Sequence, residues 1–344
     1  MTDSTQHHHP HGDAHAHDHH TGGLRGWVTG LFRPHSHDAV DAVDSALESS
    51  AQGIRAVKIS LVVLAVTATL QLLVVAISGS VALLADTVHN FSDALTAVPL
   101  WIAFVVGRRA ANRRYTYGYG RAEDLAGLFI VGMIALSAVV AGVQAVRRLI
   151  DPVAVEHVGW VALAGLIGFL GNELVAVYRI RVGRQIGSAA LVADGLHARA
   201  DGFTSLAVLG GAGGVALGFP LADPLVGLLI TVAILAVLRT AVRDVYRRLM
   251  DAVDPALIDQ AETALLTTPG VTAVRGVRMR WIGHSLHAEA DLDIDGAVSV
   301  ADAHRLAHEA EHRLTLQVPK LRTAAIHAYP TERPVPAHGA PGHQ

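Results

Sequence analysis

The sequence of 344 residues contains no cysteine, which excludes disulfides and metal sites built on thiolates. Charged residues are also scarce, because Asp, Glu, Lys and Arg together make up 17% of the chain, against about 25% in an average soluble domain. Hydrophobic residues make up 51%, and the mean hydropathy is +0.38. This shortage of charge makes residence in a membrane the first hypothesis. With 21 histidines and 4 methionines, the chain would have to hold any metal by imidazole and oxygen.

Six apolar segments have the length of about 20 residues that a membrane-spanning helix needs. Short breaks rich in Gly, Pro, Ser and Arg separate them, and the N-terminus lacks the features of a cleavable signal peptide. We therefore predict a multi-pass integral membrane protein with an all-α six-helix transmembrane bundle. The predicted spans are 54–77, 81–106, 122–146, 158–178, 188–218 and 221–240.

Arginine is concentrated in the connections on one side of these spans. The connections on the opposite side hold only Arg147 and Arg148. Because positively charged loops tend to stay in the cytoplasm, we expect the Arg-rich side, and both termini with it, to be cytoplasmic. The high usage of Ala, Val and Arg is typical of a GC-rich bacterium, so we expect the bacterial plasma membrane. The arginines concerned are Arg108, Arg109, Arg113, Arg114, Arg121, Arg179, Arg181, Arg184, Arg239, Arg243, Arg247 and Arg248.

The two ends of the chain differ from the spans in composition. Residues 1–53 combine a His-rich tract, which is predicted to be disordered, with a polar lead-in helix over 38–52. The tract is typical either of weak, exchangeable metal capture or of a purification tag. Residues 54–249 form the predicted transmembrane domain. The tail over 331–344 is rich in Pro and Gly and is predicted to be disordered.

Residues 250–330 have the character of a small domain outside the membrane. The order of elements is helix, strand, strand, helix, strand, which predicts a two-layer cytoplasmic α+β (ferredoxin-like, αββαβ) domain with antiparallel strands. The predicted helices are Pro255–Thr268 and Val300–Leu316, and the predicted strands are Val271–Trp281, Ser285–Ile294 and Thr323–Tyr329.

A short motif occurs twice within the apolar spans. ALLADTVHNFSDALT covers residues 82–96, and ALVADGLHARADGFT covers residues 190–204. Each copy holds a histidine and an aspartate four positions apart, which lie on one face of a helix. An aspartate inside a membrane costs at least ~2.5 kcal/mol, and a divalent cation would compensate for that charge. His89, Asp93, His197 and Asp201 therefore predict a four-ligand site that suits tetrahedral Zn²⁺.

Two other interpretations of the repeated motif remain open. One is polar hydrogen bonding between helices, which is the usual explanation for a single buried histidine or aspartate. The other is a proton relay, because Asp and His also carry protons through pumps. Metal binding to these groups displaces protons, so metal transport and proton transport can share one site.

Further polar residues lie in the spans beside the two motif copies. Asp86 and Asp194 precede each histidine by three positions, and they either line the route to the site or cap a helix near the outer interface. Interhelical hydrogen bonding is the default expectation for Asn90, Asn172 and Glu173. Arg199 lies off the ligand face, where we expect it to snorkel or to form an ion pair.

The cytoplasmic domain is also rich in histidine. His304, His308 and His312 recur along one helix face, and a solvated polar face explains that run at least as well as a metal site does. His287, His304 and His327 are the more specific candidates, because a strand, a helix and the last strand could converge on one ion. The domain also contains His284.

Six spans, the twin HxxxD motif, the YTYGYGRAE segment of residues 115–123 and the histidine-bearing tail domain resemble the cation diffusion facilitator family. The resemblance covers about residues 54–330. It implies a homodimer that exports Zn²⁺ or related divalent metals in exchange for protons. It also implies a transport site at His89, Asp93, His197 and Asp201, and a metal site of the cytoplasmic dimer interface at His287, His304 and His327.

The sequence departs from the family pattern at two places. Arg275 and Tyr329 replace a His and an Asp ligand of the cytoplasmic site, which implies fewer or weaker ions there. Tyr115, Tyr119 and Asn112 replace the ligands of a loop site found in some members, so we expect that loop site to be absent.

These observations favour a secondary active transporter over an enzyme. A metal-dependent hydrolase within the membrane would need a general base and an open coordination position, but neither motif copy places a glutamate beside its histidine. A membrane-anchored metal sensor is the other alternative. The expected partners are protons, the lipid bilayer, a second copy of the chain and no nucleic acid. The cargo is Zn²⁺, with Cd²⁺, Co²⁺, Ni²⁺ and Fe²⁺ as alternatives that accept the same ligands.

Overall fold

The structure is a computed structural model that describes residues 37–78, 97–150, 158–219 and 221–331. The chain divides into two compact units, Met1–His37 and Asp38–Gln344, and apart from His37 the described residues belong to the second unit. The predicted His-rich tract and the whole first motif copy, with Asp86, His89, Asn90 and Asp93, lie outside the described residues.

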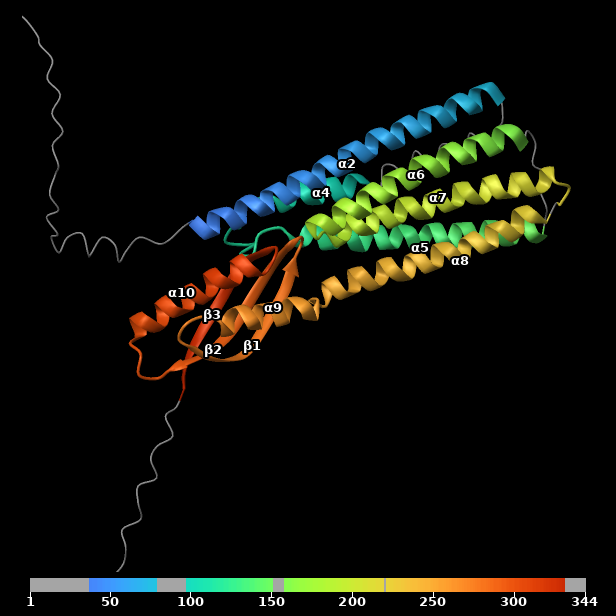
Figure 1. The fold of residues 1–344 in the computed structure, drawn as a ribbon. Helices are drawn as coiled ribbons and strands as arrows, with labels where there is room; N and C mark the ends of the chain where they lie inside the picture. The colour runs from blue at the N-terminus through green and yellow to red at the C-terminus, as the bar shows by residue number, and fades with distance from the viewer. Residues whose placement is uncertain (1–36, 79–96, 151–157, 220, 332–344) are drawn as a thin grey trace, which may run out of the picture. The chain divides into compact units, whose positions relative to one another are not determined.

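Long helices make up the N-terminal two thirds of the described chain (Figure 1). Four of them, α2, α5, α6 and α8, are long and apolar enough to cross a membrane. α7 has comparable length but carries three charged residues, and α4 is the described second part of the predicted second span. The class of an all-α membrane bundle is confirmed, and the count of six spans stays a prediction. The helices are α2 (His37–Ser78), α4 (Ala97–Gly107), α5 (Arg121–Ile150), α6 (Val158–Ile186), α7 (Ala189–Ala216) and α8 (Ala222–Leu249).

The lead-in helix predicted over 38–52 is continuous with the first span. α2 begins at His37 and runs without a break to Ser78. No Gly-Pro pair or turn motif interrupts this stretch, so the helical hydrogen bonds continue from the polar part into the apolar part. Gly53 of α2 leaves room for the ring of Phe104, because a Cβ there would lie 2.6 Å from that ring.

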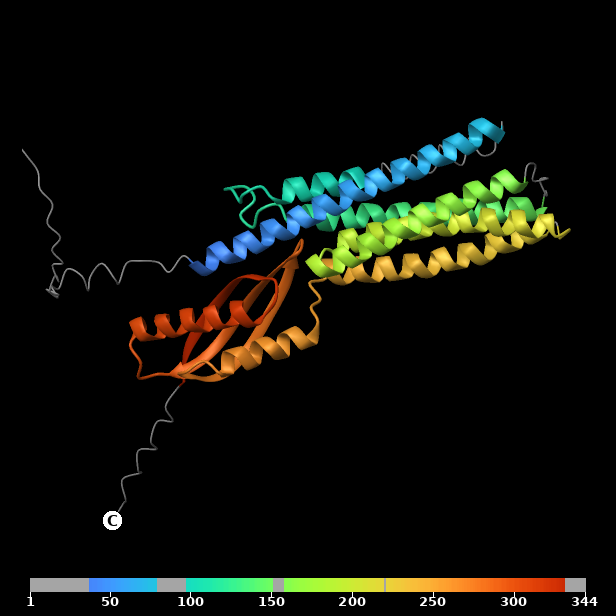
Figure 2. The same cartoon turned by 45° about the horizontal axis from the view of Figure 1, so that its top comes forward.

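The helices of the bundle run side by side, as both ribbon views show for α5, α6, α7 and α8 (Figures 1 and 2). Small residues on α6 permit this close packing. A Cβ on Gly165 would lie 2.9 Å from the carbonyl oxygen of Ser205, and one on Gly171 would lie 2.1 Å from Thr67 Oγ1. α6 therefore meets the backbone of α7 on one side and the side chain of Thr67 of α2 on another.

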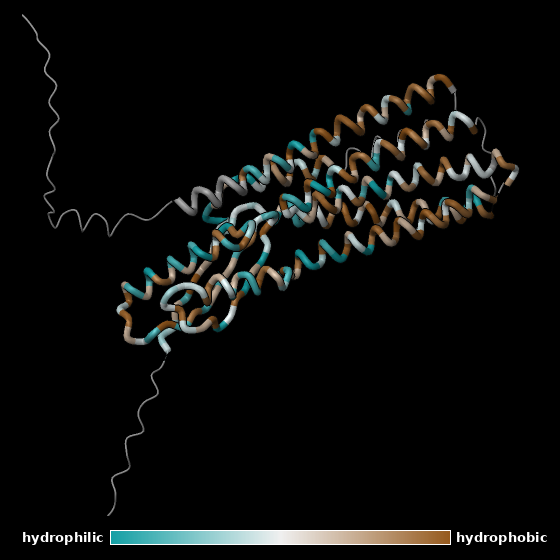
Figure 3. Tube along the Cα trace, viewed as in Figure 1, coloured by the Kyte–Doolittle hydropathy of each residue, from teal (hydrophilic) through white to brown (hydrophobic). Residues whose placement is uncertain are grey.

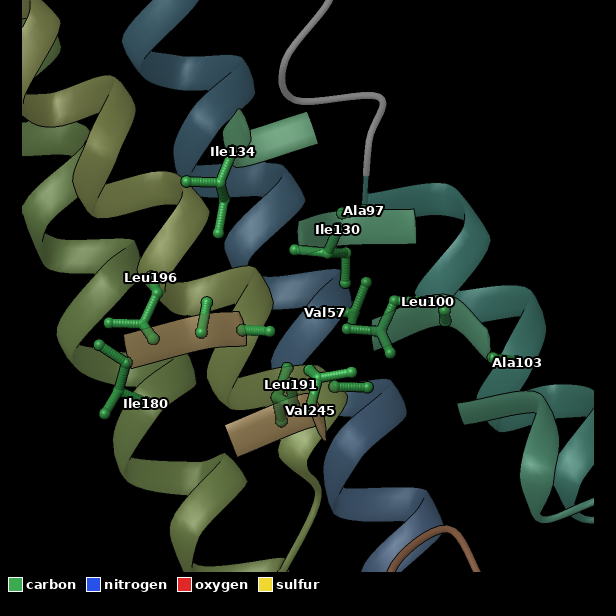
Figure 4. Close-up of a cluster of buried hydrophobic side chains, with 14 of the residues drawn as sticks. Val57, Ala97, Leu100, Ala103, Ile130, Ile134, Ile180, Leu191, Leu196 and Val245 are labelled. Carbon is green, nitrogen blue, oxygen red and sulfur yellow. The ribbon is translucent and has the colours of Figure 1, made fainter. Parts of the chain in front are cut away.

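A buried apolar core joins the helices, and apolar side chains also cover their outer surface. Val57, Leu100, Ile130 and Leu191 come from α2, α4, α5 and α7 and belong to one cluster (Figure 4). Figure 3 shows hydrophobic residues continuing along the long helices. Large exposed side chains such as Leu229, which is 68% exposed, suit contact with lipid rather than with water.

The C-terminal domain is the small α+β domain that the sequence predicts. Its sheet has the order β1-β2-β3. Leu265 of α9 and Leu314 of α10 are buried with Leu286 and Leu292 of β2, so both helices pack on the sheet. The elements are α9 (Pro255–Leu266), β1 (Val271–Ile282), β2 (Ser285–Asp295), α10 (Val300–Gln317) and β3 (Leu321–Thr331).

Local signals explain the boundaries of the two helices. Asp254 accepts a hydrogen bond from the Ala256 amide and precedes Pro255, which starts α9. Ser299 accepts one from the Asp302 amide and starts α10. These cap residues are visible in the sequence, which is why the predicted and observed helices begin at the same residues.

The prediction of purely antiparallel strands is wrong for one pair. β1 and β2 are antiparallel and joined by a tight turn, but β2 and β3 are parallel. The physical reason is the connection, because α10 lies between β2 and β3 and carries the chain back to the start of the sheet. A parallel pair needs such a crossover, whereas a hairpin turn gives an antiparallel pair.

Candidate functional site

The second motif copy lies in α7 and is buried inside the bundle. His197 Nδ1 lies 3.7 Å from Asp201 Oδ1, and the two side chains are 2% and 8% exposed. One helical turn brings them to the same face, as the spacing predicts. His89 and Asp93 lie outside the described residues, so the structure shows one half of the predicted site. Within the described part of the chain, no cluster holds three or more metal-ligating residues.

Asp194 forms a buried ion pair with Arg179 of α6. The distance from Arg179 Nη1 to Asp194 Oδ2 is 2.8 Å, and the two side chains are 3% and 0% exposed. The alternative that Asp194 caps a helix is wrong, since Ser188 Oγ accepts the hydrogen bond from the Leu191 amide in the first turn of α7. The alternative that Asp194 lines the route to the site stays a prediction.

Arg199, Glu173 and Asn172 are further polar residues of α6 and α7. Arg199 pairs with Glu173 through two contacts, of 2.6 and 3.1 Å, so the expected ion pair is confirmed and it joins α7 to α6. The Asn172 amide donates to the Gly168 carbonyl of its own helix at 3.2 Å, and the expected bond to another helix stays a prediction. An asparagine side chain is short enough to bond the preceding turn of its own helix.

Hydrogen bonds between residues of the loop after α4 stabilise its turn. Asn112 Nδ2 donates to the Tyr119 hydroxyl at 2.8 Å, and Asn112 Oδ1 accepts from the amides of Arg114 and Tyr115. The rings of Tyr115 and Tyr119 lie 4.7 Å apart. These three residues therefore have a structural role in the turn.

The cytoplasmic histidines do not converge within one chain. The parallel register pairs His287 with Thr323 and Asp291 with His327. Four residues of strand separate His287 from the level of His327, which is about 13 Å. His304 lies on α10 and stacks edge-on against His308, with ring centroids 4.5 Å apart. The parallel register therefore keeps His287 and His327 apart within one chain, and a metal site shared by His287, His304 and His327 stays a prediction.

His287 is nevertheless unusual in its electrostatics. Burial lowers its pKa to about 4, and the nearby cations Arg322, Arg280 and Arg121 add to that effect. Thr323 Oγ1 lies 2.7 Å from its Nδ1. The imidazole is therefore neutral at ordinary pH, with one nitrogen engaged by Thr323.

A guanidinium lies between the strands near the end of the sheet. Arg275 Nε donates to Asp293 at 2.5 Å, and its guanidinium carbon lies 4.6 Å from the centre of the Tyr329 ring. Arg275 and Tyr329 are the two residues that replace expected ligands of the cytoplasmic site. They contact each other, so this part of the sheet is held by a cation–π contact and an ion pair.

Sequence reasoning grouped His284 with the metal-ligand candidates and missed its contact with the bundle. Its Nδ1 lies 2.5 Å from Glu123 Oε1, and its Nε2 lies 3.2 Å from Ser50 Oγ. Glu123 is the last residue of the YTYGYGRAE segment and is 2% exposed. The only feature of the sequence that could have pointed to this contact is the glycine-rich YTYGYGRAE segment, which ends at Glu123.

The fold and the buried residues define a class, namely a multi-pass membrane protein with ionisable residues inside its helical bundle and a small α+β domain at its C-terminus. Such intramembrane residues mark pathways for ions or substrates.

Comparison with known proteins gives the family. Residues 57–250 match the model of the cation efflux transmembrane domain, and residues 253–331 match that of the cation efflux protein cytoplasmic domain. Protein Rv2025c of Mycobacterium tuberculosis, described as "Probable cation efflux system protein", is 69% identical over 317 residues, which cover 92% of this chain and 96% of that protein. The chain belongs to the cation efflux family, and the resemblance seen in the sequence is confirmed.

More distant relatives include proteins named for metals. Magnetosome protein MamB of Paramagnetospirillum magneticum is 25% identical over 254 residues, which cover 74% of this chain and 86% of that protein. Metal tolerance protein 2 of Oryza sativa is 26% identical over 278 residues, which cover 73% of this chain and 72% of that protein. Divalent metal efflux by a membrane transporter, rather than an enzymatic reaction, is the activity of the family.

Proposed function

We propose that this protein exports Zn²⁺ from the cytoplasm in exchange for protons, through a site formed by His89, Asp93, His197 and Asp201. The observation that carries the proposal is the buried pair of His197 and Asp201, 3.7 Å apart on one face of α7. The second pair has the same spacing in a second apolar segment. Two imidazoles and two carboxylates give Zn²⁺ the tetrahedral coordination that it prefers.

The chemistry of the ligands favours Zn²⁺ over the abundant alkaline-earth ions. Mg²⁺ and Ca²⁺ prefer oxygen ligands, whereas imidazole suits later transition metals. Cd²⁺, Co²⁺, Ni²⁺ and Fe²⁺ accept the same donors and are alternative cargoes. Because imidazole and carboxylate must lose protons to bind a metal, loading the site from one side and releasing the ion on the other couples metal export to proton entry.

The remaining parts of the chain have proposed roles around this site. We place both termini and the C-terminal domain in the bacterial cytoplasm, since the Arg-rich connections are on that side. We propose a homodimer in which rocking of the helices exposes the site to each side in turn, and in which metal bound to the cytoplasmic domain tightens the dimer. A metal role for His287, His304 and His327 requires donors from a second copy of the chain, because one chain does not bring them together.

The test uses the purified full chain in liposomes loaded with a metal-sensitive dye. Zn²⁺, Cd²⁺, Co²⁺, Ni²⁺ and Fe²⁺ are added in turn, and the rate of uptake is measured. We expect uptake of Zn²⁺ and its loss, by at least about 100-fold, in Asp201→Ala and in Asp93→Ala. Removal of one charged ligand leaves an incomplete coordination sphere, and ligand changes of this kind cost several kcal/mol.

Asp259→Ala is the matched control, because Asp259 is an exposed residue of α9. It removes the same side chain outside the membrane and should keep the wild-type rate. Full transport by Asp201→Ala would contradict the assignment of the site. Deletion of residues 250–344 separates a transporter from a membrane-anchored sensor, because a transporter retains some metal flux through its bundle.

A further inference from the structure

The turn between β1 and β2 is inserted into the end of the helical bundle. Gly283 and His284 form this turn. Parts of α2, α4, α5 and the residue before α7 surround it, namely Ser50, Phe104, Glu123 and Ser188. We call these four residues the socket. Three of them are buried polar residues, since Ser50, Glu123 and Ser188 are at most 4% exposed.

Hydrogen bonds run through the socket without a gap. Ser50 Oγ lies 3.2 Å from His284 Nε2, and His284 Nδ1 lies 2.5 Å from Glu123 Oε1. The other carboxylate oxygen, Glu123 Oε2, accepts from Ser188 Oγ at 3.0 Å. The imidazole thus uses both nitrogens and the carboxylate uses both oxygens, which fixes the orientation of each group.

The backbone of the turn is shaped to fit this position. Gly283 has φ of +60°, a conformation that favours glycine. A Cβ on Gly283 would lie 2.8 Å from the carbonyl oxygen of Gly120, and a Cβ on Gly120 would lie 3.0 Å from Ile282. Two glycines therefore face each other across the junction, and the second one belongs to the YTYGYGRAE segment. Side chains on either would separate the turn from the bundle.

The chain of contacts ends at the helix that carries the candidate transport ligands. Ser188 Oγ accepts a hydrogen bond from the Leu191 amide at 3.2 Å and so caps the first turn of α7. His197 follows on the same helix, and α-helices transmit small displacements of their ends as rigid bodies. A displacement of the β1–β2 turn therefore acts on the start of α7 through two side chains, Glu123 and Ser188.

We propose that His284 is a positioning residue for transport. His284 holds Glu123, which holds the capping Ser188, so the cytoplasmic domain sets the position of α7 and of the His197–Asp201 pair. This inference rests on the proposed transport site and adds the residue through which the cytoplasmic domain controls it. His284 does not bind the transported ion.

The test compares single variants of the full chain in liposomes. We expect His284→Ala to lower the maximal Zn²⁺ uptake rate by about tenfold, within the range of typical coupling between sites, while the KM for Zn²⁺ changes by less than about twofold. Such a split indicates that the ligands are intact and the conformational step is impaired. His284→Gln keeps a side-chain amide within reach of Glu123 and should recover part of the rate.

His308→Ala is the matched control, because His308 lies exposed on α10 with its ring against His304 and its Nδ1 near Glu311. It should leave rate and KM unchanged. Amide hydrogen exchange gives a second readout that needs no transport. Exchange over 189–195 should rise in His284→Ala and Ser188→Ala and stay at the wild-type level in His308→Ala.

The double variant His284→Ala/Ser188→Ala decides whether the contacts act in series. If they do, its rate and its exchange equal those of the more severe single variant. Wild-type exchange over 189–195 in His284→Ala, or single effects that multiply in the double variant, overturns the proposal. If the wild-type protein transports no metal at all, the proposed function fails while the exchange experiment still tests the coupling. Should His284→Ala not fold, His284→Gln and Ser188→Ala carry the same comparison.

Discussion

At the scale of single residues, the buried ion pair of Arg179 and Asp194 places two charges inside the described bundle. Both side chains are almost completely buried, and Arg179 Nε and Nη2 have no hydrogen-bond partner among the described residues. A charge in such surroundings is stable only beside an opposite charge. The pair lies one turn from His197 on α7, so it also sets the charge near the candidate site.

Removal of one member of this pair should destabilise the protein more than removal of both. We expect Arg179→Met to lower the free energy of unfolding by about 3 kcal/mol, because Asp194 is left buried without its partner. Arg179→Met/Asp194→Asn should recover most of that loss. Thermal melts of the purified chain in detergent give the comparison. Equal melting temperatures for the single and double variants would show that the two side chains do not depend on each other.

His287 makes stability depend on pH. Burial first, and then the cations Arg322, Arg280 and Arg121, lower its pKa from 6.5 to about 4 in the folded chain. Between these two values the unfolded chain binds a proton that the folded chain does not. Stability contributed by neutral His287 is therefore present above pH 6.5 and is lost as the pH falls towards 4. Because the ring is only partly buried, the effect is at most about 2 kcal/mol.

The measurement is the melting temperature of wild type and His287→Gln at pH 7 and pH 5. Wild type should lose more on acidification than the variant does. His308→Gln, which changes an exposed histidine, should follow wild type. An identical loss in wild type and His287→Gln would mean that other groups account for the acid sensitivity.

At the scale of elements, glycines on α6 determine how closely the helices approach. A Cβ on Gly171 would lie 2.1 Å from Thr67 Oγ1 of α2, whereas a Cβ on Gly159 would have no atom within 4 Å. Gly171→Ala should therefore push α2 away and destabilise the protein by about 1–3 kcal/mol. Gly159→Ala is the control on the same helix and should be neutral or stabilising by up to about 1 kcal/mol. Thermal melts in detergent compare them, and similar melting temperatures would argue against close α2–α6 packing.

The positions of the helices could be predicted from the sequence, but the pairing of the strands could not. Periodicity and length located the described helices, and the caps Asp254 and Ser299 fixed where α9 and α10 begin. The pairing of β2 with β3 was not predictable from alternation, because alternation looks the same in parallel and antiparallel strands. The distance between His287 and His327 within one chain could not be predicted for the same reason, since register decides which residues on neighbouring strands meet.

The contacts of single residues also differ in whether the sequence could predict them. The spacing of His197 and Asp201 was sufficient to place them on one face, because helix geometry alone determines it. The partners of Asp194 and His284 come from α6 and α5, and no local pattern identifies a partner that is distant in the sequence. Spacing along one helix was therefore enough to predict the His197–Asp201 pair, whereas the partners of Asp194 and His284 could not be identified from the sequence.

At the scale of the whole molecule, proton coupling follows from the cost of charge in a membrane. When the proposed site releases its metal, two aspartates and two histidines are left without the cation in an apolar bundle. Binding of protons removes that charge and lets the empty site return across the membrane. Net export against a gradient of Zn²⁺ should therefore need an opposing proton gradient, whereas flow down a Zn²⁺ gradient should need only exchange of protons at the site.

The prediction can be tested in liposomes with a set pH difference across the membrane. With equal Zn²⁺ on both sides, accumulation should occur only when the proton gradient points out of the compartment that fills. A protonophore together with a potassium ionophore should abolish accumulation at once, while dye-reported downhill uptake continues. Accumulation that persists after the proton gradient is collapsed would exclude proton exchange and leave Zn²⁺ movement to be explained by another driving ion. Because Asp201→Ala removes a charge that a proton would neutralise, it should lose metal uptake and metal-driven proton release together.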